Sequence, residues 1–227
     1  MHGTRKRVTT QATPQQILKG LYLILDPAVR SDRPLTDLLR EAAGHGIRLF
    51  QYRDKQATMK EAYLLARALQ QAATEVGALL IVNDRCDLAM AVEADGVHLG
   101  QEDLPIADAR QLLGPDKIIG LSTHTVAQVR EAVTGQPDYI GFGPIFHTST
   151  KADHDPVVGL EGLRAARSLA TLPIFAIGGI TADSVGQVMA EGADGVAVIS
   201  AILTAPDMGL AIRNFQQSLA KPDRRDR

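Results

Sequence analysis

The feature that most constrains this chain is a regular alternation between short apolar runs and longer segments with helical spacing. About eight such runs follow one another, and each suits a strand that is buried on both faces of a parallel sheet. No Pro/Ser-rich linker, low-complexity tract or change in composition marks the start of a second domain. Strict alternation of this length predicts an α/β fold, a single-domain (β/α)8 TIM barrel, whose active site lies at the C-terminal ends of its strands.

The apolar runs have boundaries that can be placed along the chain. We expect strands at residues 21–25, 47–52, 79–82, 95–100, 117–121, 138–142, 172–177 and 195–200. Helices are expected over 35–43, 59–76 and 160–169, with a final helix that ends near residue 219. An open, doubly wound sheet would need a glycine-rich turn after the first strand, and Leu25-Asp26-Pro27 does not supply one.

Composition narrows the class of protein. The chain has 227 residues, 45% of them hydrophobic, and a net charge of −2, which gives no reason to expect a nucleic acid or a membrane as partner. No apolar run approaches the length of a membrane span. The single cysteine, Cys86, excludes an internal disulfide, fits a reducing compartment, and is expected to be a small buried residue in a short helix. We therefore expect a soluble cytoplasmic domain that acts on small molecules; nothing in the sequence indicates an oligomeric state.

The two ends of the chain differ from the part between them. Residues 1–13 are basic but lack the apolar core of a signal peptide, so we expect a flexible leader. Residues 221–227 read as a solvated tail, which leaves residues 14–220 for the barrel.

Polar side chains follow several of the expected strands. After the second strand, alternation puts Gln51, Arg53 and Lys55 on one side of the chain, and two cations with an amide suit a pyrophosphate. A solvated strand end is the alternative for this segment.

Asp84 and Asp103 come just after two consecutive strands. Because neighbouring strands lie about 5 Å apart, these two carboxylates could share one ion, and Mg²⁺ is the ion that such oxygen ligands favour. The alternative is that each carboxylate caps the helix that follows it.

Four further strand ends complete the pattern. His124, in Ser122-Thr123-His124-Thr125, is a candidate general base, although a hydrogen-bonded histidine at a strand end is the commoner case. The stretch from Asp138 to Lys151 runs from a strand into Thr148-Ser149-Thr150-Lys151, whose hydroxyls and ammonium suit a phosphorylated ligand. Gly178-Gly179 and Ile199-Ser200 follow the seventh and eighth strands, where barrels commonly bind phosphate.

Taken together, these segments closely resemble those of the thiamine-phosphate synthase (thiamine-phosphate pyrophosphorylase) family, over about residues 21–203. Six segments in order carry the resemblance: Gln51-Tyr52-Arg53-Asp54-Lys55, Val82-Asn83-Asp84-Arg85, the run from Gly96 to Asp103, Ser122-Thr123-His124-Thr125, the run from Gly141 to Phe146 with Thr148-x-Thr150-Lys151, and Ile177-Gly178-Gly179-Ile180.

The resemblance implies a reaction. It is the condensation of 4-amino-2-methyl-5-hydroxymethylpyrimidine diphosphate with hydroxyethylthiazole phosphate, which gives thiamine phosphate and pyrophosphate with one Mg²⁺ per site. The aminopyrimidine stabilises a methylene cation, so the main task is to help pyrophosphate leave, and no acid–base pair is needed.

The resemblance also implies residue roles. The residues that would bind the pyrimidine diphosphate are Gln51, Tyr52, Arg53, Asp54, Lys55, Asn83, Ser122 and Lys151; among these Arg53, Lys55, Ser122 and Lys151 would be catalytic. Those that would bind the thiazole phosphate are Thr148, Ser149, Thr150, Gly179, Ile199 and Ser200. Asp84 and Asp103 would bind the Mg²⁺ ion.

The sequence departs from the family pattern at three positions. His147 stands where proline is common, Tyr52 where leucine is frequent, and Asp54 where glutamate is frequent. Two alternatives stay open, a thiazole tautomerase-like enzyme of the same fold and a non-catalytic barrel that binds a phosphate ester. The tautomerase should not need the full pyrophosphate set, which this sequence retains.

Overall fold

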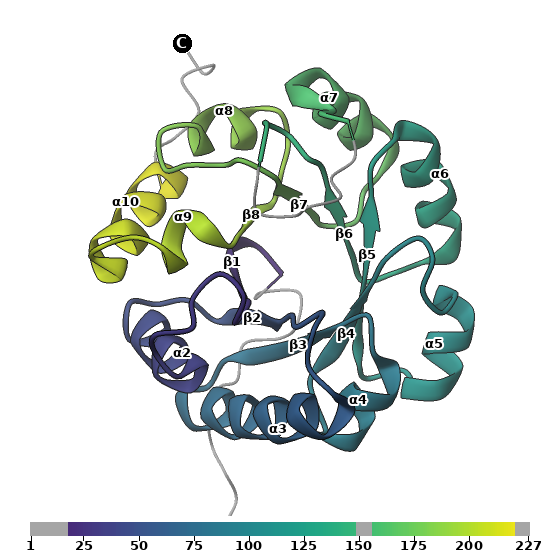
Figure 1. Ribbon diagram of the computed structural model, residues 1–227. Helices are drawn as coiled ribbons and strands as arrows, with labels where there is room; N and C mark the ends of the chain where they lie inside the picture. The colour runs from purple at the N-terminus through teal and green to yellow at the C-terminus, as the bar shows by residue number, and fades with distance from the viewer. Residues whose placement is uncertain (1–17, 149–155, 221–227) are drawn as a thin grey trace, which may run out of the picture.

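Eight parallel strands close into a barrel in the computed structural model, which describes residues 18–148 and 156–220 (Figure 1). Each strand pairs with the next one in the chain, and the last pairs with the first. The strands are β1 (Gly20–Leu25), β2 (Leu49–Tyr52), β3 (Leu79–Asn83), β4 (Gly96–Leu99), β5 (Ile118–Thr123), β6 (Tyr139–Phe142), β7 (Ile174–Ile177) and β8 (Gly195–Val198). The predicted TIM barrel is confirmed.

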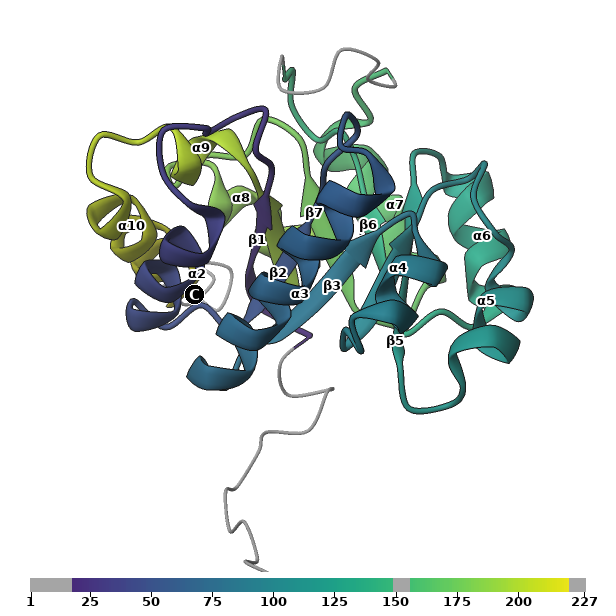
Figure 2. The ribbon, with the colours of Figure 1, turned by 60° about the horizontal axis from the view of Figure 1, so that its bottom comes forward.

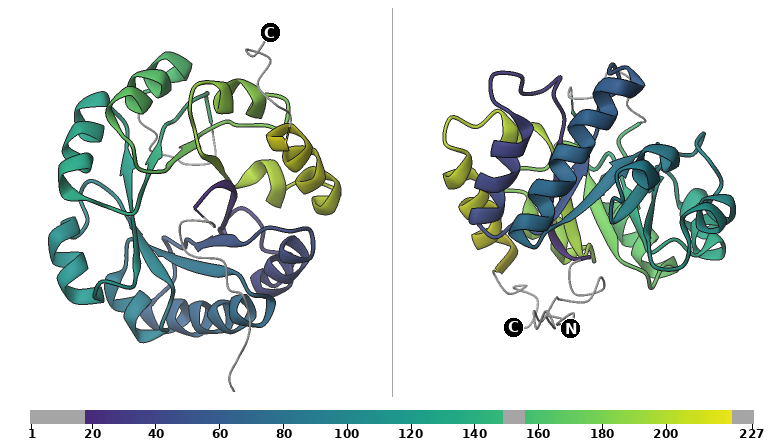
Figure 3. Two further views of the ribbon diagram at one scale, coloured as in Figure 1. Left: turned by 180° about the vertical axis from the view of Figure 1, so that it is seen from behind. Right: turned by 90° about the horizontal axis from the view of Figure 1, so that it is seen from below.

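Helices form a ring outside the barrel. They are α2 (Leu35–Gly44), α3 (Met59–Val76), α4 (Cys86–Ala91), α5 (Ile106–Leu113), α6 (Val126–Gly135), α7 (Gly159–Leu169), α8 (Val185–Ala190), α9 (Ser200–Leu203) and α10 (Met208–Ala220). Figure 2 shows α3 and α4 lying outside β2 and β3, and α10 packs beside α2 to close the ring, as the view from behind in Figure 3 shows. None of the helices in the described part of the chain has the length and apolar character needed to span a membrane.

The sequence explains the boundaries of α3. Thr58 and Glu61 form a capping box at its first turn, in which each side chain bonds the backbone N–H of the other residue. Gly77 follows the last helical residue in a left-handed conformation, with φ of 67°, that costs glycine little. The predicted helix over 59–76 is therefore confirmed at both ends. After β8, however, the chain forms two helices, α9 and α10, where one was expected.

The strands carry apolar side chains on both faces, as a barrel covered by helices requires. Outward-facing residues pack beneath the helices, and inward-facing ones fill the barrel. Tyr22, Tyr139 and Phe175 meet inside it with ring centroids 5.2 to 5.9 Å apart, in edge-to-face arrangements. These three rings fill the interior below the polar strand ends.

Cys86 is buried in α4, as expected.

Three aspartates stand just before even-numbered strands, at the other end of the barrel. Asp95, Asp138 and Asp194 accept hydrogen bonds of 2.7 to 2.8 Å from backbone N–H groups at the start of the neighbouring strand. Arg110 pairs with Asp138 at 2.6 Å and Arg167 pairs with Asp194 at 2.8 Å. These carboxylates tie neighbouring strands together at the N-terminal ends of the strands.

Candidate active site

A cavity of about 840 Å³ opens at the C-terminal ends of the strands. The predicted site residues that line it come from six strand ends: Arg53, Lys55, Asn83, Asp84, Ser122, Thr148, Gly179, Ile199 and Ser200. Asp84 and Gly179 therefore share one mouth of the barrel, as predicted. The cavity has cations and a carboxylate on one side and a glycine turn with a short helix on the other.

Arg53 is held from below by a buried carboxylate. Its Nη1 atom donates to Oδ2 of Asp26 at 2.5 Å, and Asp26 is only 3% exposed. Oδ1 of Asp26 accepts from the backbone N–H of Ala28 at 2.9 Å, so both carboxylate oxygens are engaged. This geometry fixes the guanidinium at the cavity wall. Sequence reasoning did not select Asp26, although its place at the end of the first strand was a usable signal.

Lys55 and Asp84 form an ion pair at the same side of the cavity. Asp84 adopts a left-handed backbone conformation, with φ of 62°, in which its N–H donates to the carbonyl of His98 on the adjacent strand. Residues other than glycine rarely hold this conformation, and such backbone strain is concentrated at functional sites.

Asp103 lies beside Asp84 and follows the neighbouring strand β4. Its Oδ2 atom accepts from the N–H of Gly100 at 2.6 Å. Burial, and then the nearby charge of Asp84, raise the pKa of the Asp103 carboxyl. Neither residue caps a helix, because the N-cap positions of α4 and α5 are Arg85 and Pro105, and no side chain makes a capping hydrogen bond there. The capping alternative is therefore wrong, and the two carboxylates face one another.

The donor set fits Mg²⁺. Two carboxylates are hard oxygen ligands, and a shared cation would offset the burial and the repulsion that raise the pKa of Asp103. In the described ranges, no group of three or more His, Cys, Asp and Glu side chains is arranged to hold a metal. Asp84 and Asp103 would thus leave coordination positions for phosphate oxygens and water, as is usual for Mg²⁺.

Ser122 and His124 come from the end of β5. The Oγ atom of Ser122 lies 2.9 Å from Nε2 of His98, and its carbonyl accepts from the Gln101 side chain at 2.6 Å. Nδ1 of His124 donates to the carbonyl of Gly143 at 2.8 Å. The interpretation of His124 as a hydrogen-bonded histidine at a strand end is confirmed.

The glycine turn after β7 forms the other side of the cavity. Gly178 and Gly179 have φ values of 99° and 62°, and a Cβ atom on Gly179 would lie 2.4 Å from the carbonyl oxygen of His147. The chain can only pass here without a side chain. Ile199, which follows β8, and Ser200, the first residue of α9, line the same side of the cavity, because β7 and β8 are neighbouring strands.

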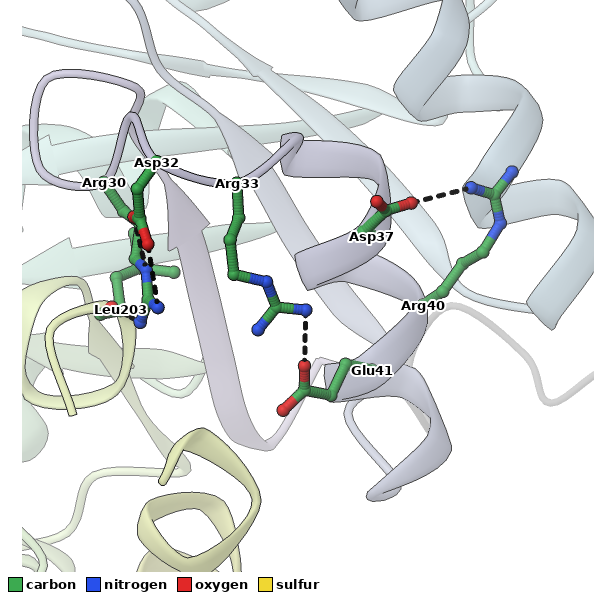
Figure 4. Close-up of polar contacts among 7 residues, drawn as sticks. All are labelled: Arg30, Asp32, Arg33, Asp37, Arg40, Glu41 and Leu203. Carbon is green, nitrogen blue, oxygen red and sulfur yellow. Dashed lines mark hydrogen bonds and ion pairs between the residues drawn. The ribbon is translucent and has the colours of Figure 1, made fainter. Parts of the chain in front are cut away.

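The loop after β1 supports α9 from outside. Arg30 donates from Nη1 to the carbonyl of Leu203, the last residue of α9, at 2.7 Å, and also pairs with Asp32 at 2.9 Å (Figure 4). Arg33 pairs with Glu41 at 2.8 Å and so joins the same loop to α2 (Figure 4). A cation at the C-terminal end of a helix is electrostatically favourable, so Arg30 helps to hold the short helix in place.

The remaining predicted site residues lie elsewhere. Gln51 is buried below the cavity. Tyr52 points to the helix side of β2, where its buried hydroxyl has no hydrogen-bond partner among the described residues. Asp54 accepts from the N–H groups of Gln56 and Ala57 at 3.0 Å and shapes the turn before α3. Ser149, Thr150 and Lys151 lie outside the described residues.

The sequence profile of the family described as Thiamine monophosphate synthase matches residues 21–202. The chain belongs to this family. Relatives named thiamine-phosphate synthase include one from Moorella thermoacetica, 44% identical over 88% of this chain and 96% of the relative. One from Methanospirillum hungatei is 44% identical over 86% of this chain and 95% of the relative. The chain thus spans nearly the whole length of both proteins.

A solved structure supports the same assignment. The thiamine phosphate pyrophosphorylase from Pyrococcus furiosus superposes with a TM-score of 0.80 at 38% identity, over 89% of this chain and 96% of that one. A geranylgeranylglyceryl phosphate synthase from Thermoplasma acidophilum, solved with sn-glycerol-1-phosphate, reaches a TM-score of 0.70 at 13% identity. The second likeness shows the fold alone.

Proposed function

We propose that this chain is a thiamine-phosphate synthase that joins 4-amino-2-methyl-5-hydroxymethylpyrimidine diphosphate to hydroxyethylthiazole phosphate, releasing pyrophosphate. The observation that carries the proposal is one cavity whose two sides suit two different phosphorylated molecules. Arg53, Lys55 and Asp84 line one side, and Gly179 and Ser200 line the other. Its volume of about 840 Å³ can hold both substrates together. We also propose that the enzyme acts in the cytoplasm, which its single cysteine supports.

The diphosphate would lie against Arg53 and Lys55. Arg53 is already oriented by Asp26, so little conformational entropy is lost when it binds an anion. Lys55 is paired with Asp84 and is half exposed, so its ammonium can take a second anionic partner. Lys151 is proposed to add a third cation. Asn83 and Ser122 would contact the pyrimidine, with Gln51 beneath them.

One Mg²⁺ is proposed to bind between Asp84 and Asp103, and when bound it would supply positive charge to the departing pyrophosphate. The protein's part is to orient the diphosphate so that its bridging C–O bond breaks and the electron pair leaves with pyrophosphate. The cationic methylene carbon then forms a bond with the thiazole nitrogen, which carries a lone pair and no proton. No proton transfer is required, which agrees with the fixed, hydrogen-bonded role of His124.

The thiazole phosphate is proposed to lie in the turn of Gly178 and Gly179. Backbone N–H groups there and at Ser200 can approach a phosphate closely, because no Cβ atom intervenes at the glycines. Ile199 would contact the same substrate, and Thr148, Ser149 and Thr150 would add hydroxyl donors. Tyr52 and Asp54 are proposed to act only by shaping the segment that carries Arg53 and Lys55.

The test is Mg²⁺-dependent release of pyrophosphate with stoichiometric formation of thiamine phosphate by the purified chain. Release should require both substrates and stop when EDTA removes the metal. Binding of both substrates without turnover would favour a non-catalytic phosphate-ester-binding barrel. Turnover of a thiazole carboxylate phosphate alone would favour a tautomerase-like enzyme.

A further inference from the structure

A chain of hydrogen bonds crosses the barrel interior between two proposed pyrimidine contacts, Gln51 and Ser122. Gln51 Nε2 lies 2.8 Å from the Tyr22 hydroxyl, which lies 2.9 Å from that of Tyr139. The Tyr139 hydroxyl lies 3.0 Å from Nδ1 of His98, and Nε2 of His98 lies 2.9 Å from the Ser122 Oγ atom. All five side chains line a small cavity of about 40 Å³ that shares Ser122 with the main cavity. The chain of hydrogen bonds therefore ends at the proposed site.

A glycine makes this chain of hydrogen bonds possible. In the strand register Gly120 of β5 pairs with His98 of β4 on one side and with Tyr139 of β6 on the other. A Cβ atom on Gly120 would lie 2.2 Å from Cζ of Tyr139 and 2.6 Å from Nδ1 of His98. The two rings instead stack above the glycine with centroids 5.4 Å apart. The two rings occupy the space that a side chain at position 120 would fill.

The hydrogen bonds in this series all run in one direction. Burial raises the pKa of both Tyr22 and Tyr139 well above the ordinary value, so each phenol keeps its one proton at neutral pH. The Gln51 amide donates to Tyr22, and Tyr22 in turn can donate to Tyr139. Tyr139 then donates to Nδ1 of His98. The reverse order would give the Tyr22 oxygen two incoming hydrogen bonds and leave its own buried proton without an acceptor among these side chains, which is unfavourable.

We infer that Tyr22, Tyr139 and His98 are positioning residues. The two tyrosines hold His98 with its proton on Nε2, and His98 in turn sets the orientation of the Ser122 hydroxyl. Because Nε2–H donates to Oγ, the hydroxyl proton of Ser122 points away from His98 and is offered to an acceptor in the main cavity, a ring nitrogen or a diphosphate oxygen. This inference rests on the proposed function for the substrate that receives the proton, but the tautomer of His98 belongs to the free protein.

The first test is side-chain ¹⁵N NMR of the histidine-labelled full chain without substrates, with the His98 signals assigned from their loss in His98→Gln. We expect Nε2 to carry the proton and Nδ1 to be unprotonated. Tyr139→Phe removes the donor to Nδ1 and should shift both signals toward a mixture of tautomers. Tyr63→Phe, a matched change on α3 outside the barrel, should leave them unchanged. A proton on Nδ1 in the unmodified chain, or unchanged signals in Tyr139→Phe, would overturn the inference.

The second test is steady-state kinetics with both substrates. Tyr139→Phe should lower kcat/KM for the pyrimidine diphosphate by about five- to tenfold, the effect of weakening one hydrogen bond, and leave KM for the thiazole phosphate unchanged. Kinetics equal to those of Tyr63→Phe would overturn the role assigned to Ser122. If the unmodified protein forms no thiamine phosphate, the proposed function fails. The NMR result still decides the direction of the hydrogen bonds.

Discussion

At the scale of single residues, the candidate site is organised by paired charges. Arg53 and Asp26 form a nearly buried pair, whereas Lys55 and Asp84 form a more exposed one. A pair that is shielded from water holds its geometry better and is screened less by salt. Arg53 is therefore the cation whose orientation the protein determines most strongly.

Removing the charge of Asp26 should reduce activity through Arg53. Asp26→Asn keeps an oxygen for the Ala28 N–H but removes the ionic partner of Arg53, so we expect kcat to fall about tenfold, with little change in KM for the thiazole phosphate. Asp87→Asn is the matched control, because Asp87 pairs with Arg85 on the exposed surface. Steady-state kinetics test this prediction. Equal rates for the two variants would contradict the role of Asp26 in orienting Arg53.

The raised pKa of Asp103 predicts a stability effect that depends on pH. The folded chain binds this proton more tightly than the unfolded chain, so Asp103 lowers stability as pH rises above its unfolded pKa. Asp103→Asn should thus raise the Tm of the metal-free protein at pH 7, and the gain should shrink as pH falls through the raised pKa. Added Mg²⁺ should stabilise the unmodified chain and not the variant. Thermal unfolding with and without EDTA tests both effects, and a lower Tm for the variant at pH 7 would refute them.

At the scale of elements, strands are joined by backbone ladders at their centres and by side chains at the end opposite the cavity. Asp95, Asp138 and Asp194 repeat one arrangement before β4, β6 and β8, and each accepts from the backbone N–H of the first or second residue of the preceding strand. The repetition explains why a helix-covered strand of only four residues can keep its register. It also separates stability from activity, because these carboxylates stand away from the cavity.

Asp138→Ala should therefore destabilise the barrel without changing its chemistry. The substitution leaves the Ile119 N–H without its carboxylate acceptor and removes the ionic partner of Arg110, which keeps its backbone carbonyl acceptors, at a cost of about 1–3 kcal/mol. Urea unfolding should show this loss, while kcat at a temperature well below the transition stays unchanged. Asp116→Ala, in the exposed turn before β5, should change stability by no more than about 0.5 kcal/mol. Equal stabilities of the two variants would show that the carboxylate ties contribute nothing.

At the scale of the whole molecule, the closed barrel brings strand ends from both halves of the chain to one cavity. The half that carries Asp84 offers carboxylates, which bind an anion only through a metal ion. The half that carries Gly179 offers backbone N–H groups, which need no metal. The two proposed substrates should therefore depend on different parts of the cavity.

This division predicts opposite effects of two substitutions. Asp84→Asn should abolish Mg²⁺-dependent binding of the pyrimidine diphosphate and leave binding of the thiazole phosphate nearly intact. Gly179→Val should do the reverse, since its Cβ atom would collide with the carbonyl of His147 and φ of 62° strains any branched residue. Calorimetric titration of each variant with each substrate, with and without Mg²⁺, tests both parts. Equal loss of thiazole phosphate binding in both variants would mean one coupled pocket.

The sequence by itself determined the architecture and several of the residues that line the candidate site. Apolar runs alternating with helical segments lead to a barrel, and polar residues that follow parallel strands must gather at one end of it. Both conclusions depend on local patterns, which a single chain displays directly. Arg53, Asp84 and Gly179 were found in this way and do line one cavity.

Only the tertiary structure decided which side chains touch inside the barrel. Asp26 and Arg53 are 27 residues apart, and Tyr22 and Tyr139 are 117 apart, so their contacts depend on the register of strands around the closed ring. A shift of one residue in that register would turn every inward side chain outward. Local patterns do not encode the register, and for that reason Asp26 and the hydrogen-bonded chain from Gln51 to Ser122 emerged only once the strands were in place.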